Sequence, residues 1–327
     1  MLKAKPYVVG TSLVFLLVAA VVWFAAKPKS PENAFVATCG HKLREKLCFV
    51  DRHGVAECNL SESRFDVLES KLLAIFEHSP DQVQQKLCDI GAISVNYPSN
   101  GIEPWMGAFT NYKVIGINMF DWFNVGVPFE RPAHAYLTWY PTETGSFSIP
   151  NREKIKVKFT SDSDFQVGLN YTLARSIYHE VGHLVQADLR HDPFKCISAP
   201  TQPTTLPFAN ASGEAYCDQY ITPHQNHTLL SKLQKSAHVS YYASCTRYED
   251  FAETYASYIM SNLMNRNIVA TLNDETIYDQ RTHLGNPTVR QKFKAVANIM
   301  KFALDSTKNK NKLNRSLENC SGPFEQN

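Results

Sequence analysis

The residues best suited to chemistry lie at His179-Glu180-Val181-Gly182-His183, an H-E-x-x-H pattern. Positions four apart lie on one face of a helix, so His179 and His183 can direct their imidazoles at one metal ion. Glu180 follows the first histidine by one position, roughly 100° round the helix axis, which places its carboxylate beside the metal. Two imidazole nitrogens with an adjacent base predict a hydrolytic zinc site.

The stretch around this motif has the pattern of a helix. It contains no proline from position 165 to position 192. Its apolar residues recur at helical spacing: Leu169, Leu173, Ile177, Val181, Leu184 and Val185. Two histidines that are merely packed in a core would give the same spacing. They would not explain the glutamate between them, so the pattern favours the zinc site.

Two histidines leave a tetrahedral zinc site incomplete, and a third protein ligand is needed with the fourth position open. The extended pattern H-E-x-x-H-x-x-G-x-x-H is absent, because Gln186 and Leu189 stand where it requires glycine and histidine. His191 is displaced by two residues and precedes Asp192-Pro193, where the helix is expected to end. We therefore expect the third ligand on a second helix.

Glu249 and Glu253 are candidates for that ligand, because they lie four apart on one face of a second predicted helix. One would bind zinc, and the other would hydrogen-bond a ligating histidine and fix its tautomer. A solvated acidic first turn is the alternative interpretation. Apolar residues in the same stretch favour a buried helix instead: Phe251, Ala252, Tyr255, Ala256 and Ile259.

The H-E-x-x-H helix, the second helix reading Glu-x-Phe-Ala-Glu from Glu249, and Tyr242 seven residues before it together resemble the catalytic domain of anthrax lethal factor and its relatives. These proteins are gluzincins, zinc peptidases with a glutamate ligand. The resemblance covers roughly residues 165 to 265. It implies that Glu249 is the third ligand, that Glu253 supports a ligating histidine, and that Tyr242 stabilises the oxyanion.

Alternatives to this assignment stay open at the level of sequence. Glu253 could be the ligand in place of Glu249, one helical turn away. Other candidate oxyanion donors lie nearby: Tyr241, Tyr248 and His238.

An uncharged run of twenty residues, 7–26, is long enough to span a bilayer as a helix. A cleaved signal peptide is the alternative, but its apolar run is usually shorter, and Phe24 fits poorly in an A-x-A-like exit. We predict a membrane anchor at 7–26 after a short cytoplasmic N-terminus at 1–6. If the segment is cleaved, the protein is secreted.

All eight cysteines follow this apolar run. An even number behind an export signal indicates disulfides in an oxidising compartment, here the periplasm or extracellular space. We expect Cys48 and Cys58 to staple a hairpin, and Cys196 and Cys217 to clip a proline-rich loop.

The sequence predicts an α+β fold with a transmembrane helix, a small disulfide-rich helical region at 30–93, and a zincin-like catalytic domain at 94–327. In that domain, strands at 112–119, 133–140 and 154–159 form a mixed sheet before the motif helix, and the C-terminal part is mostly helical. A last helix begins at Asn286-Pro287.

Composition excludes one class of partner. The net charge is +2, so there is no charge-based case for nucleic acid. We predict a zinc-dependent endopeptidase acting on peptide or protein substrates, with Glu180 as general base. The alternatives are a non-catalytic zinc protein of the cell envelope, and a zinc amidase acting on cell-wall peptides.

Overall fold

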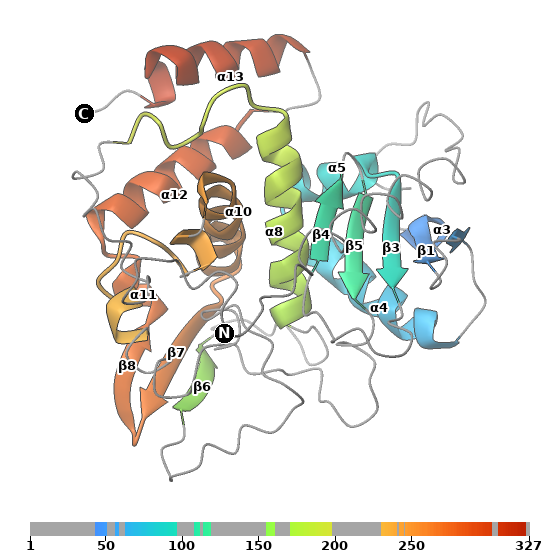
Figure 1. The fold of residues 1–327 in the computed structure, drawn as a ribbon, viewed down its shortest axis with the longest axis horizontal. Helices are drawn as coiled ribbons and strands as arrows, with labels where there is room; N and C mark the ends of the chain where they lie inside the picture. Colours follow the sequence, from blue (N-terminus) through green and yellow to red (C-terminus); the bar gives the residue numbers. More distant parts are fainter. Residues whose placement is uncertain are drawn as a thin grey trace, which may run out of the picture. The chain divides into compact units, whose positions relative to one another are not determined.

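The computed structural model describes residues 43–50, 56–58, 63–96, 108–111, 114–118, 155–160, 171–197, 230–240, 242–244, 246–302 and 307–324. The predicted anchor at 7–26 and the predicted strand at 133–140 lie outside these ranges. Within them, no helix has both the length and the apolar character to cross a membrane. The chain divides into two compact units, which we describe separately. Together they form a mixed α/β structure that is mostly helical, with small sheets (Figure 1).

The first unit, Met1–Ser79 with Gln84–Val127, contains a five-stranded sheet in the order β2-β1-β3-β5-β4. β3 lies parallel to β1 and β5, while β2 and β4 are antiparallel edge strands. The strands are β1 (Leu47–Val50), β2 (Ala56–Cys58), β3 (Ala92–Asn96), β4 (Ala108–Asn111) and β5 (Val114–Asn118). Its helices are α3 (Leu43–Lys46), α4 (Ser63–His78) and the larger part of α5 (Asp81–Asp89), of which residues 81–83 belong to the second unit.

The helical region expected at 30–93 contains the helices α4 and α5, but it is not purely helical. Its strands β1 and β3 belong to a sheet that continues with β5, across the predicted boundary between residues 93 and 94. Strands as short as four or five residues cannot be distinguished from helix segments by periodicity alone. The hairpin at Cys48 and Cys58 is confirmed, since these residues are register partners. Cys48 is disulfide-bonded, and its bond to Cys58 stays a prediction.

The second unit, Pro80–Val83 with Pro128–Asn327, carries the motif helix. Its antiparallel sheet has the order β6-β7-β8, with β6 (Ile155–Thr160), β7 (Asn267–Leu272) and β8 (Glu275–Asp279). The expected strand at 154–159 is confirmed as β6, but its partner follows the two site helices in sequence. The helices are α8 (Tyr171–Ala187), α10 (Arg247–Tyr258), α11 (Gln280–His283), α12 (Pro287–Met300) and α13 (Thr307–Asn319). Shorter turns are η4 (Tyr242–Ser244), the π-helical η5 (Ile259–Leu263) and η6 (Gly322–Phe324).

α8 and α10 pack closely against each other and run antiparallel, since Arg175 meets Ser257 at one end and His183 meets Glu249 at the other. Gly182 sets their separation. A Cβ atom at this position would lie 2.9 Å from the Cα atom of Ala252, closer than real Cβ contacts allow. Glycine therefore permits the two backbones to approach each other.

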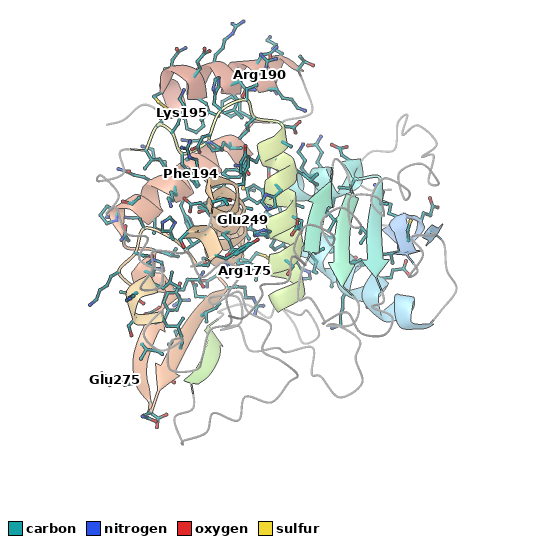
Figure 2. The ribbon with its side chains drawn as sticks, in the orientation of Figure 1. Arg175, Arg190, Phe194, Lys195, Glu249 and Glu275 are labelled. Carbon is teal, nitrogen blue, oxygen red and sulfur yellow. A yellow bond between two sulfur atoms is a disulfide. The ribbon has the colours of Figure 1, made fainter. Side chains whose placement is uncertain are left out.

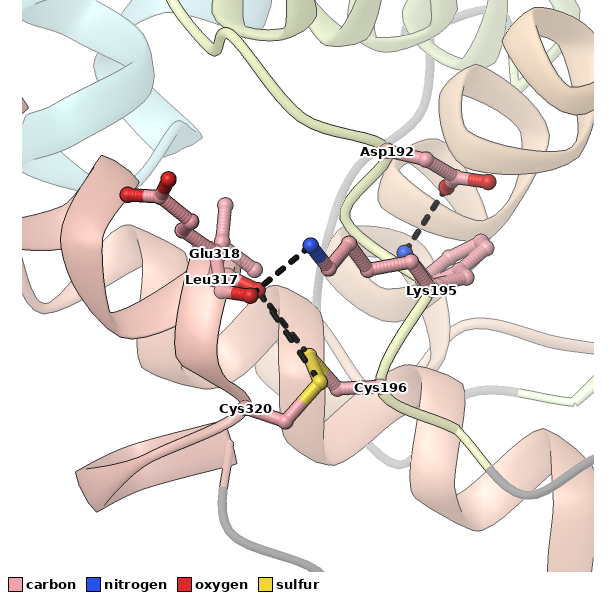
Figure 3. The surroundings of a disulfide bond; sticks show 7 residues. Asp192, Lys195, Cys196, Leu317, Glu318 and Cys320 are labelled. Carbon is pink, nitrogen blue, oxygen red and sulfur yellow. Dashed lines mark hydrogen bonds between the residues drawn. A yellow bond between two sulfur atoms is a disulfide. The ribbon is translucent and has the colours of Figure 1, made fainter.

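A disulfide joins Cys196, nine residues beyond α8, to Cys320 at the end of α13 (Figure 3). Lys195 reinforces this junction by donating from Nζ to the carbonyl oxygen of Glu318 at 2.9 Å. The expected bond between Cys196 and Cys217 is wrong. Disulfide connectivity follows spatial proximity, and eight cysteines allow 105 pairings that sequence cannot rank.

Candidate metal centre

The first turn of α10 directs the Glu249 side chain toward α8. Thr246 caps the helix, and its side-chain oxygen accepts a hydrogen bond from the Glu249 backbone N–H at 3.1 Å. The positive end of the helix dipole also favours a carboxylate in the first turn. From this turn the Glu249 side chain reaches the histidines of α8. Figure 2 labels Glu249 near α8.

Three potential ligand atoms meet between α8 and α10. His179 Nε2 lies 3.1 Å from His183 Nε2, and Glu249 Oε2 lies 3.1 Å and 3.4 Å from these two nitrogens. Ligands of a tetrahedral zinc at about 2.0–2.1 Å are separated from one another by about 3.3 Å. The three atoms thus have the spacing of one face of a zinc tetrahedron.

The chemistry of these atoms also fits a cation. Glu249 Oε2 is buried and has no hydrogen-bond partner, although two imidazole nitrogens lie close to it. Burial opposes ionisation of Glu249, but the imidazoles of His179 and His183 outweigh it and hold its pKa well below the usual range. A carboxylate oxygen and two imidazole nitrogens that converge at this spacing form a donor set that suits a metal ion.

The opposite nitrogen of His179 contacts Glu253. His179 Nδ1–H donates to Glu253 Oε1 at 2.8 Å, and Glu253 is almost completely buried. Burial raises the pKa of Glu253, but Arg175 and His179 outweigh it and lower the pKa, so the carboxylate is ionised and can only accept. In the neutral imidazole that a metal requires, a proton on Nδ1 leaves the Nε2 lone pair of His179 directed at the convergence point.

Glu180 and Tyr242, the two predicted catalytic residues, both lie beside this cluster. Glu180 is 3% exposed, and its Oε1 is 4.0 Å from His179 Nε2. The ring centroid of Tyr242 is 5.9 Å from that of His179. Burial, and after it the charge of Glu249, raises the pKa of Tyr242 above its ordinary value. The phenol therefore stays protonated and can donate a hydrogen bond.

The other candidate donors lie in different surroundings. His238 Nδ1 contacts Asp250 Oδ1 at 3.4 Å, in a cluster with Lys292. Tyr248 is 68% exposed, and Tyr241 lies outside the described residues. Among the predicted site residues, the structure brings together His179, Glu180, His183, Tyr242, Glu249 and Glu253.

Sequence reasoning missed Arg175. This side chain is 1% exposed and donates from Nη2 to Glu253 Oε2 at 2.5 Å. An arginine one turn before His179, on a helix with few other charges, was the available signal.

The chain was compared with known protein families, curated proteins and solved structures. No curated protein and no solved structure matches it significantly. Residues 167–322 match the family described as "Putative zinc-binding metallo-peptidase". The matched stretch contains both α8 and α10, and with them the His179, His183 and Glu249 cluster. The family description and the donor set agree on zinc as the cofactor, and the match supports a peptidase.

Proposed function

We propose that the protein is a zinc-dependent endopeptidase of the gluzincin type, with a zincin-like catalytic domain. His179, His183 and Glu249 would hold the zinc. The observation that carries this proposal is the convergence of their three ligand atoms at 3.1–3.4 Å, with Glu180 beside them. Glu249 is preferred over Glu253 as the ligand because Glu253 contacts Nδ1 of His179, on the side of the ring away from the cluster.

Zinc, when bound, supplies Lewis-acid activation of the scissile carbonyl and of water. Glu180 acts as the general base, taking a proton from the attacking water as its oxygen bonds to the carbonyl carbon. As the C–N bond breaks, Glu180 delivers that proton to the leaving amine. Its burial supports this role, because a carboxylate in a water-excluded site does not exchange its proton with bulk water during the reaction.

In this proposal, Tyr242 is the hydrogen-bond donor that stabilises the oxyanion. Its protonated phenol donates to the oxygen that becomes negative when the carbonyl is attacked. Removing one such donor typically costs about 3–4 kcal/mol of transition-state stabilisation. Glu253 fixes the orientation and tautomer of His179 through the Nδ1–H hydrogen bond.

We also propose that the catalytic part lies outside the cytoplasm, anchored by the segment 7–26. The uncharged run and the even number of cysteines support this. In the part of the chain that the structure describes, no cysteine is free.

The Glu180→Gln variant tests the mechanism. Glutamine cannot accept the proton, so cleavage of a mixed peptide library should slow by about 10²- to 10⁴-fold while bound zinc stays at the wild-type level. Glu275→Gln, at an exposed carboxylate in β8, is the matched control and should cleave normally. Full activity in Glu180→Gln with zinc retained would contradict the proposal. Zinc binding without cleavage in the wild type would favour the non-catalytic alternative.

A further inference from the structure

Arg175 is a buried cation in the interior of the metal-site unit. It lies in the first half of α8, one turn before His179, and only 1% of its surface is exposed. Removing a guanidinium from water is costly unless charge and hydrogen bonds compensate. Its position therefore requires a partner, and that partner lies on the other helix of the site.

The partner is the carboxylate of Glu253, and its two oxygens have different functions. Oε2 accepts from Arg175 Nη2, whereas Oε1 accepts from His179 Nδ1 at 2.8 Å. Arg175 and His179 both belong to α8, and Glu253 belongs to α10. One carboxylate thus bridges a guanidinium and a candidate zinc ligand.

The guanidinium constrains the orientation of this carboxylate. Without Arg175, the carboxylate would keep its hydrogen bonds to His179 and Ser240 but lose its contact to the guanidinium, and its terminal torsion has a broad preference that permits rotation. The contact from Arg175 to Oε2 fixes the carboxylate plane, so Oε1 stays in line with the Nδ1–H bond. The imidazole in turn keeps its Nε2 directed at His183 and Glu249.

We propose that Arg175 is a positioning residue for the metal centre, acting through Glu253 on the orientation of His179. The inference rests on the proposed zinc site and adds a residue to it. Arg175 does not touch substrate or metal. Its effect should appear as faster loss of zinc, in the range found for outer partners of histidine ligands, about 10- to 100-fold.

The first test measures zinc transfer from the full-length protein to a chromogenic chelator. Arg175→Met should release zinc about 10- to 100-fold faster than the wild type. Arg175→Lys should fall between them, since lysine restores the charge but not the planar fork. Ser257→Ala is the control. It removes a second contact of Arg175, at 3.4 Å, without changing Glu253, and should release zinc at the wild-type rate.

A double variant separates positioning from a general loss of structure. Arg175→Met alone leaves a buried carboxylate without its cation, whereas Arg175→Met with Glu253→Gln is neutral at both positions. If Arg175 acts through Glu253, the double variant loses zinc at the rate of Glu253→Gln alone. If the two effects multiply, or if Arg175→Met releases zinc at the wild-type rate, the inference is overturned.

Cobalt substitution gives a second readout that a merely structural role would not change. The visible absorption of bound Co²⁺ reports ligand geometry, so a displaced His179 should alter the bands in Arg175→Met and leave them unchanged in Ser257→Ala. Failure of the proposed function has a different signature. A wild-type chain that binds no zinc refutes the metal centre itself, whereas a wild type with one zinc and an unaffected Arg175→Met refutes only the role of Arg175.

Discussion

Two consecutive residues of α10, Glu249 and Asp250, belong to two different buried charge clusters. Glu249 joins His179 and His183 at the candidate metal centre. Asp250 points to α12, where Lys292 Nζ donates to its two carboxylate oxygens at 2.8 Å and 2.6 Å. Successive side chains on a helix diverge by about 100°, so one turn of α10 serves both clusters.

The clusters differ in how donors and acceptors match. Lys292 also donates to the Ala237 carbonyl at 2.9 Å, so an ammonium with three donors meets three acceptors. Around Glu249, in contrast, a carboxylate oxygen and two ring nitrogens face one another. Two imidazoles and a carboxylate that converge at ligand spacing therefore mark a candidate metal centre, whereas donors and acceptors that match one to one mark a structural ion pair.

The largest expected effect is loss of zinc in Glu249→Ala. Removal of a direct ligand should weaken zinc binding by more than the 10- to 100-fold typical of an outer partner. Elemental analysis of purified protein measures the bound zinc. Glu253→Ala is the matched comparison and should keep more zinc than Glu249→Ala. The reverse order would show that the ligand lies one turn further along α10.

Lys292→Met should break the ion pair without affecting the metal. The variant leaves a buried carboxylate unpaired, which typically costs about 3–5 kcal/mol of folding free energy. Denaturant unfolding measures that loss, and the zinc content should match the wild type. Lys294→Met, at an exposed position of the same helix, is the control and should unfold like the wild type. An unchanged unfolding midpoint in Lys292→Met would refute the structural role.

Gly182→Ala tests the close approach of α8 and α10. The added methyl group would lie 2.9 Å from the Ala252 backbone, which forces the helices apart. We expect a loss of about 1–3 kcal/mol in stability, the usual cost of overpacking, together with weaker zinc binding. Competition against a chelator measures the second effect. If Gly182→Ala had the stability and zinc affinity of the wild type, the two helices could accommodate the methyl group without cost.

In zinc-free protein, His179 and Asp250 should contribute pH dependences of opposite sign, and the lowered pKa values of Glu249 and Glu253 add to the loss of stability in acid. Burial lowers the pKa of His179, but Glu249 and Glu253 outweigh it and raise the pKa to about 10. That stabilisation is present below the ordinary histidine pKa of about 6.5 and is lost as pH rises to about 10, with a slope of at most about 1.4 kcal/mol per pH unit.

The stabilisation by Asp250 depends on pH with the opposite sign. Burial raises its pKa, but Lys292 outweighs it and lowers the pKa, so its stabilisation is present above the ordinary aspartate pKa and is lost as pH falls. Unfolding midpoints across the pH range measure both slopes. Zinc should remove the alkaline slope, because a ligating histidine carries no proton on Nε2. An alkaline slope that persists with zinc would contradict the assignment of His179.

The sequence predicted the parts of the site that depend on helical spacing. His179, His183, Glu249 and Glu253 meet because each pair is four residues apart on one helix. Arg175 could not be assigned in this way, because its role depends on which residue of α10 faces it, and that follows from how α8 and α10 pack against each other.

Sheet partners were harder to predict. β7 and β8 were missed although their turn carries a signal, since Asn273 and Asp274 both adopt positive φ, as tight hairpins require. The pairing of β6 with β7 joins segments separated by more than a hundred residues, and no local pattern encodes it. The Cys196–Cys320 bond is undetermined by sequence for the same reason.

The Cys196–Cys320 disulfide also makes the stability of the fold depend on the redox state of the surroundings. It closes a covalent ring with a sequence separation of 124 residues, and this ring contains α10 and therefore Glu249. Opening so large a ring gives the unfolded chain enough conformational entropy to destabilise the fold by about 4–5 kcal/mol in the chain-entropy model. In a reducing compartment the ring is open and folding is less favourable. Oxidation of this one cysteine pair would then stabilise the part of the fold that carries Glu249, so completion of the candidate metal centre depends on the redox state of the surroundings.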